Sequence, residues 1–454
     1  MNKLYKKLPY PIKFILVNIY SYMQEKRRYK AGFKHALKFY QSVDFTEMYE
    51  LNIDKIKESV SDNSYYNIKS ADDFYNLPVI NKEIIKKDYD RIINKNYLST
   101  FIFTGGTTGS GLKFPVSQEF INHQWALFWK FRILHGIGLN TWCAYLIGKT
   151  LLKRERKTPP FWVKSFLSRQ LLLSLPHLNS GTIKLFLEQI KKNNIRWIHG
   201  YPSALNLMTQ LIKEQKLEST AKELGISVIT TSSEILYQYQ KENIEEIFGC
   251  KVRQLYGLTE GVANIFECEE GNLHVDETFS YVEFIEDQNL PGYCKIVGTS
   301  YNNKAFPLLR YDTGDSVLLP DAGFSCRCGR KSRVVKEIIG REQDYLIMPD
   351  YTKRVRIGSI IFRELTNVKK AQIIQRHVGR AEFYIVKGPA YNSKDEKTLL
   401  NNIENYLGGD FKADIIYTDT LQVSKNGKIR LIINELDYDS LLQNTESDKL
   451  INAF

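Results

Sequence analysis

No stretch of this 454-residue chain reaches the roughly 18 to 20 consecutive apolar residues that a membrane-spanning helix requires. The N-terminal apolar run over residues 14–19 is short, contains Asn18 and is not followed by a small-residue cleavage site, so we do not expect a signal peptide. These absences predict an unprocessed, cytoplasmic protein.

Cysteine is also scarce, and the sequence has no internal repeat, low-complexity tract or coiled-coil heptad. Scattered cysteines in a chain without an export signal argue against a disulfide framework. The six cysteines are Cys143, Cys250, Cys268, Cys294, Cys326 and Cys328.

Acidic residues are few at the N-terminus, where residues 1–34 hold nine Lys and Arg but only Glu25, a charge of 9 − 1 = +8 out of +12 for the chain. No nucleic-acid-binding module accompanies these cations, so we expect no nucleic-acid partner. A basic amphipathic segment can lie on anionic lipid, here as a peripheral contact at the inner face of the membrane. The alternative is a helix packed on the main domain with its charges in solvent.

The remaining sequence predicts a globular α/β protein, since 43% of its residues are hydrophobic and 25% charged. Residues 35–97 are polar and helical in pattern. Between 100 and 340, short β-rich runs alternate with helical stretches such as 182–194, whose apolar residues recur at spacings of three and four. This alternation favours an α/β architecture with mostly parallel strands.

The pattern of predicted helices and strands changes near residue 340, where a compact α+β unit begins. We predict strands over 372–379, 381–388 and 413–418, and a helix over 394–407. Asn426 and Gly427 lie between two β-prone runs and predict a tight hairpin.

A glycine- and threonine-rich loop lies between two β-prone runs within residues 100–117. It is not a Walker A loop, because Leu112 follows Gly111 where that motif needs lysine. It is not a Rossmann fingerprint either, since Pro115 disfavours the helix that should follow. Glycines and hydroxyls at such a turn can bind an anion; the alternative is an ordinary surface hairpin.

Six short motifs follow one another along the chain: TGGTTGSG (104–111), TSSE (231–234), YGLTE (256–260), RYDTGD (310–315), GREQD (340–344) and NGKIR (426–430). In this order they resemble the motifs of the adenylate-forming superfamily of acyl-CoA synthetases. The resemblance covers most of the chain and is strongest to the phenylacetate-CoA ligase-like branch, which includes the CapK-type proteins of capsule and polysaccharide gene clusters.

The resemblance implies a large N-terminal adenylate-forming domain (1–340), a hinge (341–344) and a small mobile C-terminal α+β lid domain (345–454). It implies a ligase that uses ATP and Mg²⁺ to convert a small carboxylic acid into an acyl adenylate. The acyl group would then pass to coenzyme A or to an amine on a sugar or amino acid. The alternative from a different class is a scaffold protein that binds nucleotide without turnover.

The first motifs would bind the phosphates and adenine of ATP. Ser233 and Glu234 would lie at the adenine pocket, and Tyr256, followed by Gly257, would stack on the base. Hydroxyl and backbone donors of the loop would surround the β- and γ-phosphates. The loop residues are Thr104, Gly105, Gly106, Thr107, Thr108, Gly109 and Ser110.

The later motifs would bind the ribose and stabilise the reacting groups. Asp315 would accept hydrogen bonds from the ribose hydroxyls, with Arg341 reaching the ribose or the phosphate; the alternative for Asp315 is an Asp-turn after Gly314. The hinge would be Asp344, preceded by Gln343 where many relatives have aspartate. Gly111, which replaces a common proline, would loosen the phosphate loop.

Three residues would carry the chemistry. Glu260 would hold Mg²⁺ and Thr259 would contact the α-phosphate, although YGLTE also describes a strand end with a helix cap. Lys428 would bridge the substrate carboxylate and the α-phosphate while negative charge accumulates. An exposed hairpin is the alternative for this lysine, and Lys425 is its nearby competitor.

A further group combines Cys268 and His274, spaced Cys-x₅-His, with Cys326 and Cys328, spaced Cys-x-Cys. These residue types are zinc ligands, but the spacing is not that of a standard zinc finger. The resemblance favours a structural Zn²⁺, because phenylacetate-CoA ligase-like proteins can carry zinc in this region.

The pocket for the acid would lie between residues 123–148 and 198–205. These segments contain several aromatic and imidazole side chains, a type found more often in a core than in a pocket. They are His123, Trp125, His135, His199 and Tyr201.

Overall fold

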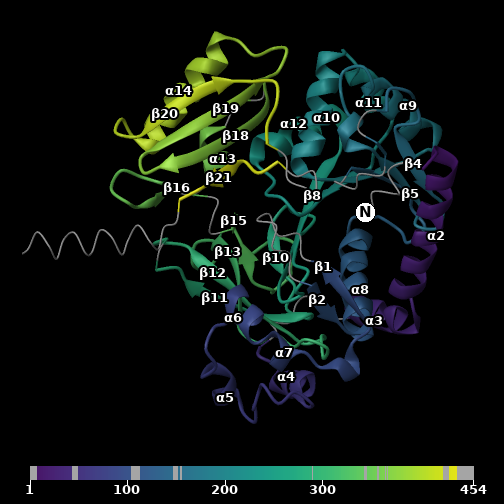
Figure 1. The fold of residues 1–454 in the computed structure, drawn as a ribbon, viewed down its shortest axis with the longest axis vertical. Coiled ribbons are helices and arrows are strands. Elements are labelled where there is room, and N and C mark those ends of the chain that lie inside the picture. The colour runs from purple at the N-terminus through teal and green to yellow at the C-terminus, as the bar shows by residue number, and fades with distance from the viewer. Residues whose placement is uncertain are drawn as a thin grey trace, which may run out of the picture.

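The computed structural model describes residues 8–42, 50–103, 113–146, 152–153, 156–288, 290–341, 345–354, 357–362, 365, 367–422 and 429–436. Within these ranges, no helix is long and apolar enough to cross a membrane. Figure 1 shows a large body built mainly of N-terminal and central elements, with the C-terminal sheet and α14 at one end.

The N-terminal region is helical, as predicted for residues 35–97. Side-chain caps begin several of these helices; Ser70, for example, forms a capping box with Asp73 at the start of α5. The helices are α2 (Tyr10–Arg28), α3 (Ala31–Ser42), α4 (Ile53–Val60), α5 (Ala71–Tyr75), α6 (Lys82–Lys87) and α7 (Tyr89–Ile92), followed by the 3₁₀ turn η1 (Lys95–Tyr97).

The predicted strands on both sides of the glycine-rich loop are confirmed. β1 (Thr100–Phe103) pairs antiparallel with β2 (Lys113–Val116), and Phe103 lies opposite Lys113. The loop itself, residues 104–112, lies outside the described residues.

A nine-stranded mixed sheet forms the centre, in the order β14-β10-β9-β8-β7-β6-β3-β5-β4. Its strands are β3 (Cys143–Leu146), β4 (Trp162–Ser165), β5 (Gln170–Leu173), β6 (Trp197–Gly200), β7 (Val228–Thr231), β8 (Lys251–Gly257), β9 (Asn264–Glu267), β10 (Leu273–Val275) and β14 (Val334–Val335). The prediction of parallel strands is confirmed for β5, β3, β6, β7 and β8 and wrong for the flanks, where the pairs are antiparallel. β9 and β10 are joined by a short turn, which only antiparallel strands allow.

Helices cover both faces of this sheet, so its parallel strands are buried on both sides. Ala144, Ile198 and Ile229 pack in one core with the helices α9 to α12. The alternate residues, such as Cys143 and Trp197, pack in a second core with α3 and α8. The covering helices are α8 (Gln118–Leu134), α9 (Ile183–Lys192), α10 (Pro202–Glu214), α11 (Glu218–Glu223) and α12 (Gln238–Phe248), with the 3₁₀ turn η2 (Leu175–His177) between β5 and α9.

A second, antiparallel sheet packs beside β9 and β10 through Ile265, Val275, Val282 and Ile296, which share a small core. Its order is β11-β12-β13-β15. The strands are β11 (Ser280–Glu286), β12 (Cys294–Ser300), β13 (Tyr311–Leu318) and β15 (Glu337–Arg341).

The C-terminal region forms its own four-stranded sheet, β20-β19-β18-β21, with a separate core that includes Phe362, Phe383 and Leu399. The predicted strands and helix between 372 and 418 are confirmed, whereas the predicted hairpin at Asn426 lies outside the described residues. The elements are β16 (Leu346–Ile347), β17 (Lys353–Arg354), α13 (Ile357–Ile361), β18 (Val368–His377), β19 (Arg380–Lys387), α14 (Ser393–Leu407), β20 (Lys412–Tyr417) and β21 (Ile432–Asn434).

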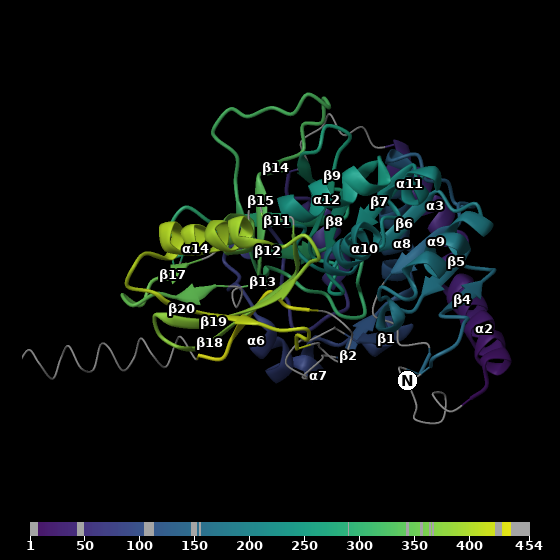
Figure 2. The same ribbon diagram turned by 90° about the horizontal axis from the view of Figure 1, so that it is seen from above.

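This C-terminal region touches the central body at a few points. Lys369 Nζ lies 3.1 Å from Glu214 Oε2 of α10. Tyr237, at the start of α12, lies against Gly358 of α13 so closely that a Cβ atom on this glycine would be 2.2 Å from the tyrosine ring. In Figure 2 the C-terminal sheet and α2 lie on opposite sides of the molecule.

Candidate functional site

The candidate site lies at the carboxyl ends of the parallel strands. In the sheet, β5 is the neighbour of β3 on one side. The next parallel strand along the chain, β6, is the neighbour of β3 on the other side. Such a change of direction is the point at which open α/β sheets bind their ligands. The turns after β7 and β8 carry the TSSE and YGLTE motifs at the same edge of the sheet.

Polar and aromatic side chains lie together at the change of direction. His199 of β6 stacks on Tyr145 of β3 with ring centroids 5.1 Å apart, and His199 Nδ1 lies 2.8 Å from Thr230 Oγ1. Burial, and then the positive charge of Arg132, lower the pKa of His199 to about 3. This imidazole is therefore neutral at physiological pH and can donate or accept one hydrogen bond without carrying charge.

Of the other aromatic and imidazole residues named from the sequence, Tyr201 lies near this group: burial and, more weakly, Cys143 and Tyr201 raise the pKa of Tyr145 to about 12. The other three do not join the group. His123 Nδ1 bonds the Tyr40 hydroxyl at 2.9 Å, and His135 Nε2 lies 2.9 Å from the carbonyl oxygen of Glu267. Trp125 lies under the guanidinium of Arg28, 3.9 Å from its ring centroid. Tyr201 is buried in the core formed by α9 to α12. Tyr145 and Thr230 were missed, because their proximity to His199 depends on sheet register.

The TSSE motif forms a strained turn after β7. Ser233 has a positive φ of 69°, which is uncommon for residues other than glycine. Glu234 Oε2 accepts a hydrogen bond of 3.1 Å from the backbone N–H of Ser203, in the first turn of α10. In this structure the Glu234 carboxylate thus caps α10, a contact that the sequence did not predict.

The YGLTE and RYDTGD motifs meet directly. The hydroxyl of Tyr256, at the end of β8, donates a hydrogen bond of 2.7 Å to Asp315 Oδ2 of β13. Burial raises the pKa of Tyr256 well above its ordinary value, and the negative charges of Asp315 and, more weakly, Glu260 add to this. The phenol therefore remains protonated and holds the Asp315 carboxylate in one orientation.

Asp315 occupies an irregular part of β13. Ser316 pairs with Lys295 while Asp312 pairs with Val297, so β13 bulges between these pairs. Gly314 has a φ of +71°, and its N–H donates 2.8 Å to Asp312 Oδ1. An Asp-turn is therefore present, but the carboxylate that forms it is that of Asp312, before Gly314, and not that of Asp315, which accepts from Tyr256.

Residues of the later motifs lie near this pair. Arg341 of β15 is paired with Asp315 in the antiparallel register, which brings the ends of the RYDTGD and GREQD motifs together. Gly257 ends β8 opposite Asn264, and Thr259 and Glu260 lie half-buried in the following turn. The site thus gathers residues from three separate motifs.

The remaining candidate residues lie outside the described residues. They are Thr104, Gly105, Gly106, Thr107, Thr108, Gly109, Ser110, Gly111, Gln343, Asp344, Lys425 and Lys428.

The contact between Tyr256 and Asp315 leads to a testable expectation. Replacing Tyr256 by phenylalanine removes one hydrogen bond to a charged group, so we expect the KM for ATP to rise about five- to tenfold with little change in kcat. Tyr384→Phe is the matched control, because Tyr384 donates 2.8 Å to Glu382 in the C-terminal sheet. Steady-state kinetics test this, and equal KM values in both variants would contradict it.

The structure brings the four proposed zinc ligands together. One ligand atom from each of Cys268, His274, Cys326 and Cys328 lies within 4.8 Å of all the others. Cys268 Sγ is 3.7 Å from Cys326 Sγ, and Cys328 Sγ is 3.4 Å from His274 Nε2. Around a tetrahedral zinc ion the corresponding separations are about 3.8 Å between sulfurs and about 3.6 Å between sulfur and nitrogen.

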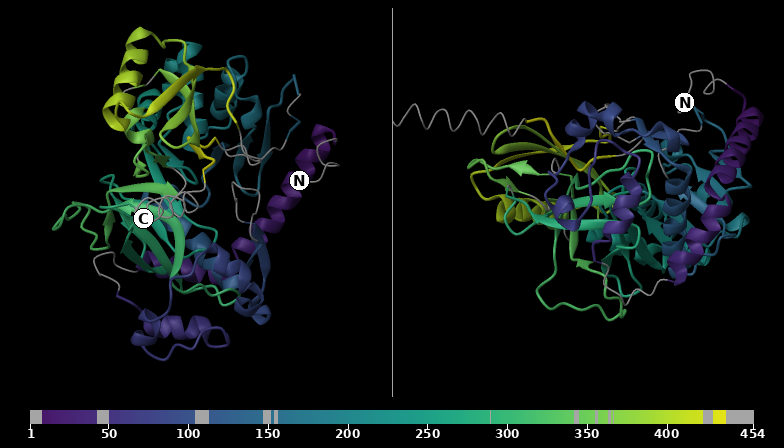
Figure 3. Two further views of the ribbon diagram at one scale, coloured as in Figure 1. Left: turned by 60° about the vertical axis from the view of Figure 1, so that its left-hand side comes forward. Right: turned by 90° about the horizontal axis from the view of Figure 1, so that it is seen from below.

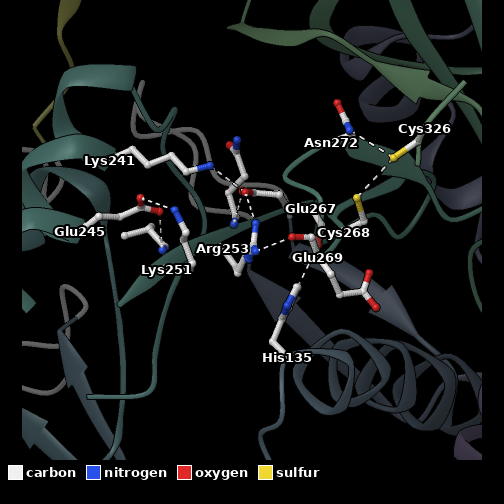
Figure 4. A network of polar contacts seen from close by, with 12 residues as sticks. His135, Lys241, Glu245, Lys251, Arg253, Glu267, Cys268, Glu269, Asn272 and Cys326 are labelled. Atoms are coloured by element: carbon white, nitrogen blue, oxygen red, sulfur yellow. Dashed lines mark hydrogen bonds and ion pairs between the residues drawn. The ribbon is translucent and has the colours of Figure 1, made fainter. Parts of the chain in front are cut away.

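Neighbouring side chains orient these four residues. Asn272 Nδ2 donates 3.1 Å to Cys326 Sγ, and His274 Nδ1 lies 3.1 Å from Ser332 Oγ, which fixes the imidazole with Nε2 toward the sulfurs. Figure 4 shows Cys268 and Cys326 facing each other, with Asn272 beside them. Asn272 and Ser332 could not be identified from the sequence, since oxygen and amide partners of this kind have no characteristic spacing.

A buried ion-pair network lies next to this cluster (Figure 4). Glu267 is fully buried in β9 and contacts Lys241 Nζ at 2.7 Å and Arg253 Nη1 at 3.0 Å. The second carboxylate oxygen accepts from the backbone N–H of Gln254. Because all its partners are polar and close, this charge is compensated, and the network fixes β9, the strand that ends directly before Cys268.

The chain is similar to known proteins. Residues 352–435 match the family model of the CapK C-terminal domain. Over 464 aligned residues the chain is 23% identical to protein CapK of Staphylococcus aureus, covering 96% of this chain and 100% of that protein. It is 30% identical over 136 residues to a phenylacetate-coenzyme A ligase of Thermus thermophilus, covering 28% of this chain and 30% of that protein.

The fold has counterparts among solved structures. A 2-hydroxyisobutyryl-CoA ligase, solved in the postadenylation state with 2-HIB-AMP, superposes with a TM-score of 0.61 at 15% identity. The match covers 98% of this chain and 94% of that structure.

Proposed function

Because the chain is a CapK homologue with the fold of the adenylate-forming ligases, we propose that it is an AMP-forming ligase that activates a carboxylic acid with ATP. The acyl adenylate would then react with coenzyme A. The contact that carries the proposal is the hydrogen bond of 2.7 Å between Tyr256 and Asp315, with Arg341 opposite Asp315 in the sheet. It joins three motifs that are far apart in the sequence at the edge where ligands bind in α/β sheets.

Each described residue has a role in this proposal. Asp315, oriented by Tyr256, accepts hydrogen bonds from the ribose hydroxyls. The Glu260 carboxylate is a hard oxygen ligand and would hold Mg²⁺, which neutralises phosphate charge when bound. Thr259, in the same turn, contacts the α-phosphate, and Gly257 and Ser233 border the adenine. Glu234 fixes the position of this border through α10.

The phosphate loop and the lysine complete the site. Thr104, Thr107, Thr108 and Ser110 supply donors for the β- and γ-phosphates, and Lys428 stabilises the charge that develops between the carboxylate and the α-phosphate. Residues 341–344 form a hinge between an N-terminal domain (1–340) and a C-terminal domain (345–454). The separate C-terminal sheet supports this division, and its core consists of C-terminal residues except for Tyr239 of α12, with Tyr237 packed against it.

The acid binds, in this proposal, beside Tyr145, His199 and Thr230. These side chains are neutral and can form hydrogen bonds, so the pocket suits an acid with a polar or aromatic acyl group better than a long alkyl chain. The 2-hydroxyisobutyryl-CoA ligase of similar fold acts on a short hydroxy acid, so hydroxy acids are the first substrates to test.

The proposed biological setting is supported by the similarity to protein CapK. We propose a cytoplasmic enzyme of capsule or polysaccharide biosynthesis, in which an amine on a sugar or amino acid is the second candidate acceptor. We also propose that Cys268, His274, Cys326 and Cys328 hold one structural Zn²⁺, supported by separations close to those of a tetrahedral site.

Pyrophosphate release tests the proposed reaction. Purified protein is mixed with ATP and Mg²⁺ and a panel of hydroxy, aryl, fatty and amino acids, with and without coenzyme A or an amine. Release that depends on one acid class supports adenylation, and dependence on the second reactant identifies the acceptor. No release with any acid, with ATP binding intact, would contradict the proposal and favour the scaffold alternative.

A further inference from the structure

Helix α2 presents apolar side chains to solvent. Seven residues, 38–62% exposed, form this outer face of α2: Ile12, Ile15, Leu16, Ile19, Tyr20, Tyr22 and Met23. Most of them recur at spacings of three and four, so they lie along one side of the helix. Figure 3 shows α2 along the outside of the molecule, and no described helix or strand covers its outer side.

Polar groups hold the opposite side of α2 against the protein. Asn18 donates 3.0 Å to the Lys164 carbonyl and accepts 3.0 Å from the Phe166 N–H. The buried Ser21 hydroxyl accepts a hydrogen bond of 2.7 Å from Ser165 Oγ. Val17, Tyr10 and Phe14 on this side also pack in a small core with Val163 and Leu172, so α2 carries apolar residues on its inner side as well as on its outer side. Because these contacts and the hydrogen bonds hold α2 against the protein, its outer face stays exposed.

The exposed apolar surface continues beyond the helix. Phe166 and Leu167, at the turn between β4 and β5, are 53% and 46% exposed. The ring of Phe14 lies 6.0 Å from that of Phe166, which joins this turn to α2. Contiguous apolar surface of this kind marks an interaction site, in contrast to single exposed residues.

Cations border this surface. Lys26, Lys30 and Lys34 are exposed at and beyond the end of α2, and Lys164 Nζ lies 4.9 Å from the Phe166 ring centroid. Glu25 is the only acidic residue between positions 8 and 42. Apposing two copies of this surface would bring like charges together, whereas an anionic surface complements them.

We propose that the outer face of α2 docks the protein on an anionic lipid bilayer. The apolar side chains enter the interface between headgroups and acyl chains, and the bordering lysines contact the acidic headgroups. Docking uses the side of the molecule opposite the C-terminal sheet, which therefore faces the cytoplasm (Figures 1 and 2). This inference is independent of the proposed reaction.

Vesicle sedimentation tests the proposal. We expect the full-length protein to sediment with vesicles that contain phosphatidylglycerol, and less with pure phosphatidylcholine. Ile15→Glu and Ile19→Glu should each weaken this binding at least about tenfold, since each places a charge in the apolar interface. Leu400→Glu is the matched control, because Leu400 of α14 is 47% exposed, close to the 54% and 51% of Ile15 and Ile19. Melting temperatures equal to wild type show that the variants are folded.

Several results would overturn the proposal. One is indifference of the wild type to anionic vesicles. Another is equal binding by the Ile19→Glu and Leu400→Glu proteins, which would place the contact elsewhere. A third is a wild-type dimer that Ile19→Glu dissociates, with no vesicle binding, which would assign the outer face of α2 to a second copy of the chain.

Discussion

Pyrophosphate release with the preferred acid is expected to fall by about a hundred- to a thousandfold when Lys428 is replaced by alanine. Removing one preorganised donor from developing negative charge costs this much in other enzymes. Because the charge is concentrated in the transition state of adenylation, the loss should be in kcat more than in the KM for ATP. ATP–pyrophosphate exchange measures the same step independently.

Two comparisons separate this role from a general effect on folding. Lys425→Ala, three residues earlier in the same segment, should retain most of the activity. When the acyl adenylate itself is supplied with coenzyme A, Lys428→Ala should form thioester at nearly the wild-type rate. Equal losses in both lysine variants, or an equal loss in both half-reactions, would contradict the assignment of Lys428.

Elemental analysis of carefully purified protein is expected to find one zinc per chain, and Cys328→Ser should lose it. A structural zinc contributes several kcal/mol to folding, so we expect the melting temperature of Cys328→Ser to fall by roughly 5 °C or more. The effect arises because the cluster ties the turn at 268–274 to the segment that contains Cys326, close to the ion-pair network of Glu267.

Cys294→Ser is the matched control, because Cys294 is half-buried like Cys328 but does not belong to the cluster. It should keep both the metal and the stability. Wild-type protein that contains no zinc, or that keeps its melting temperature after exhaustive chelation, would show that the four residues are ordinary reduced thiols and an imidazole.

The candidate residues of the site could be named from the sequence, whereas their long-range pairings could not. Short motifs predicted Tyr256 and Asp315 as nucleotide ligands, but the hydrogen bond between them joins positions 59 residues apart. It depends on how two different sheets pack. The same limit explains Tyr145 and Thr230, which approach His199 only because three parallel strands are in register.

The same holds for the fold: local helices and strands could be predicted, but long-range strand pairings could not. The helical and strand periodicities correctly predicted α9, α14 and the C-terminal strands. The antiparallel strands at the two edges of the central sheet were not predicted. Alternating helices and strands indicate the crossover connections between parallel strands, but they do not indicate hairpins at the edges. Periodicity also could not tell which apolar residues of α2 face inward, because the helix has them on two sides: Val17 is buried, whereas Ile15 and Ile19 are exposed.

The close approach of Gly358 to Tyr237 has a consequence for the domain rotation that we propose. A methyl group at position 358 would fall 2.2 Å from the tyrosine ring, so the arrangement seen here excludes even alanine without local rearrangement. A conformer in which the C-terminal region has turned away is free of this clash. Gly358→Ala should therefore favour the conformer in which the C-terminal region has turned away. A destabilisation of the present arrangement by about 3 kcal/mol would change the ratio of the two conformers by about a hundredfold. Position 358 thus gives access to the conformational equilibrium without altering any residue proposed to contact the substrates.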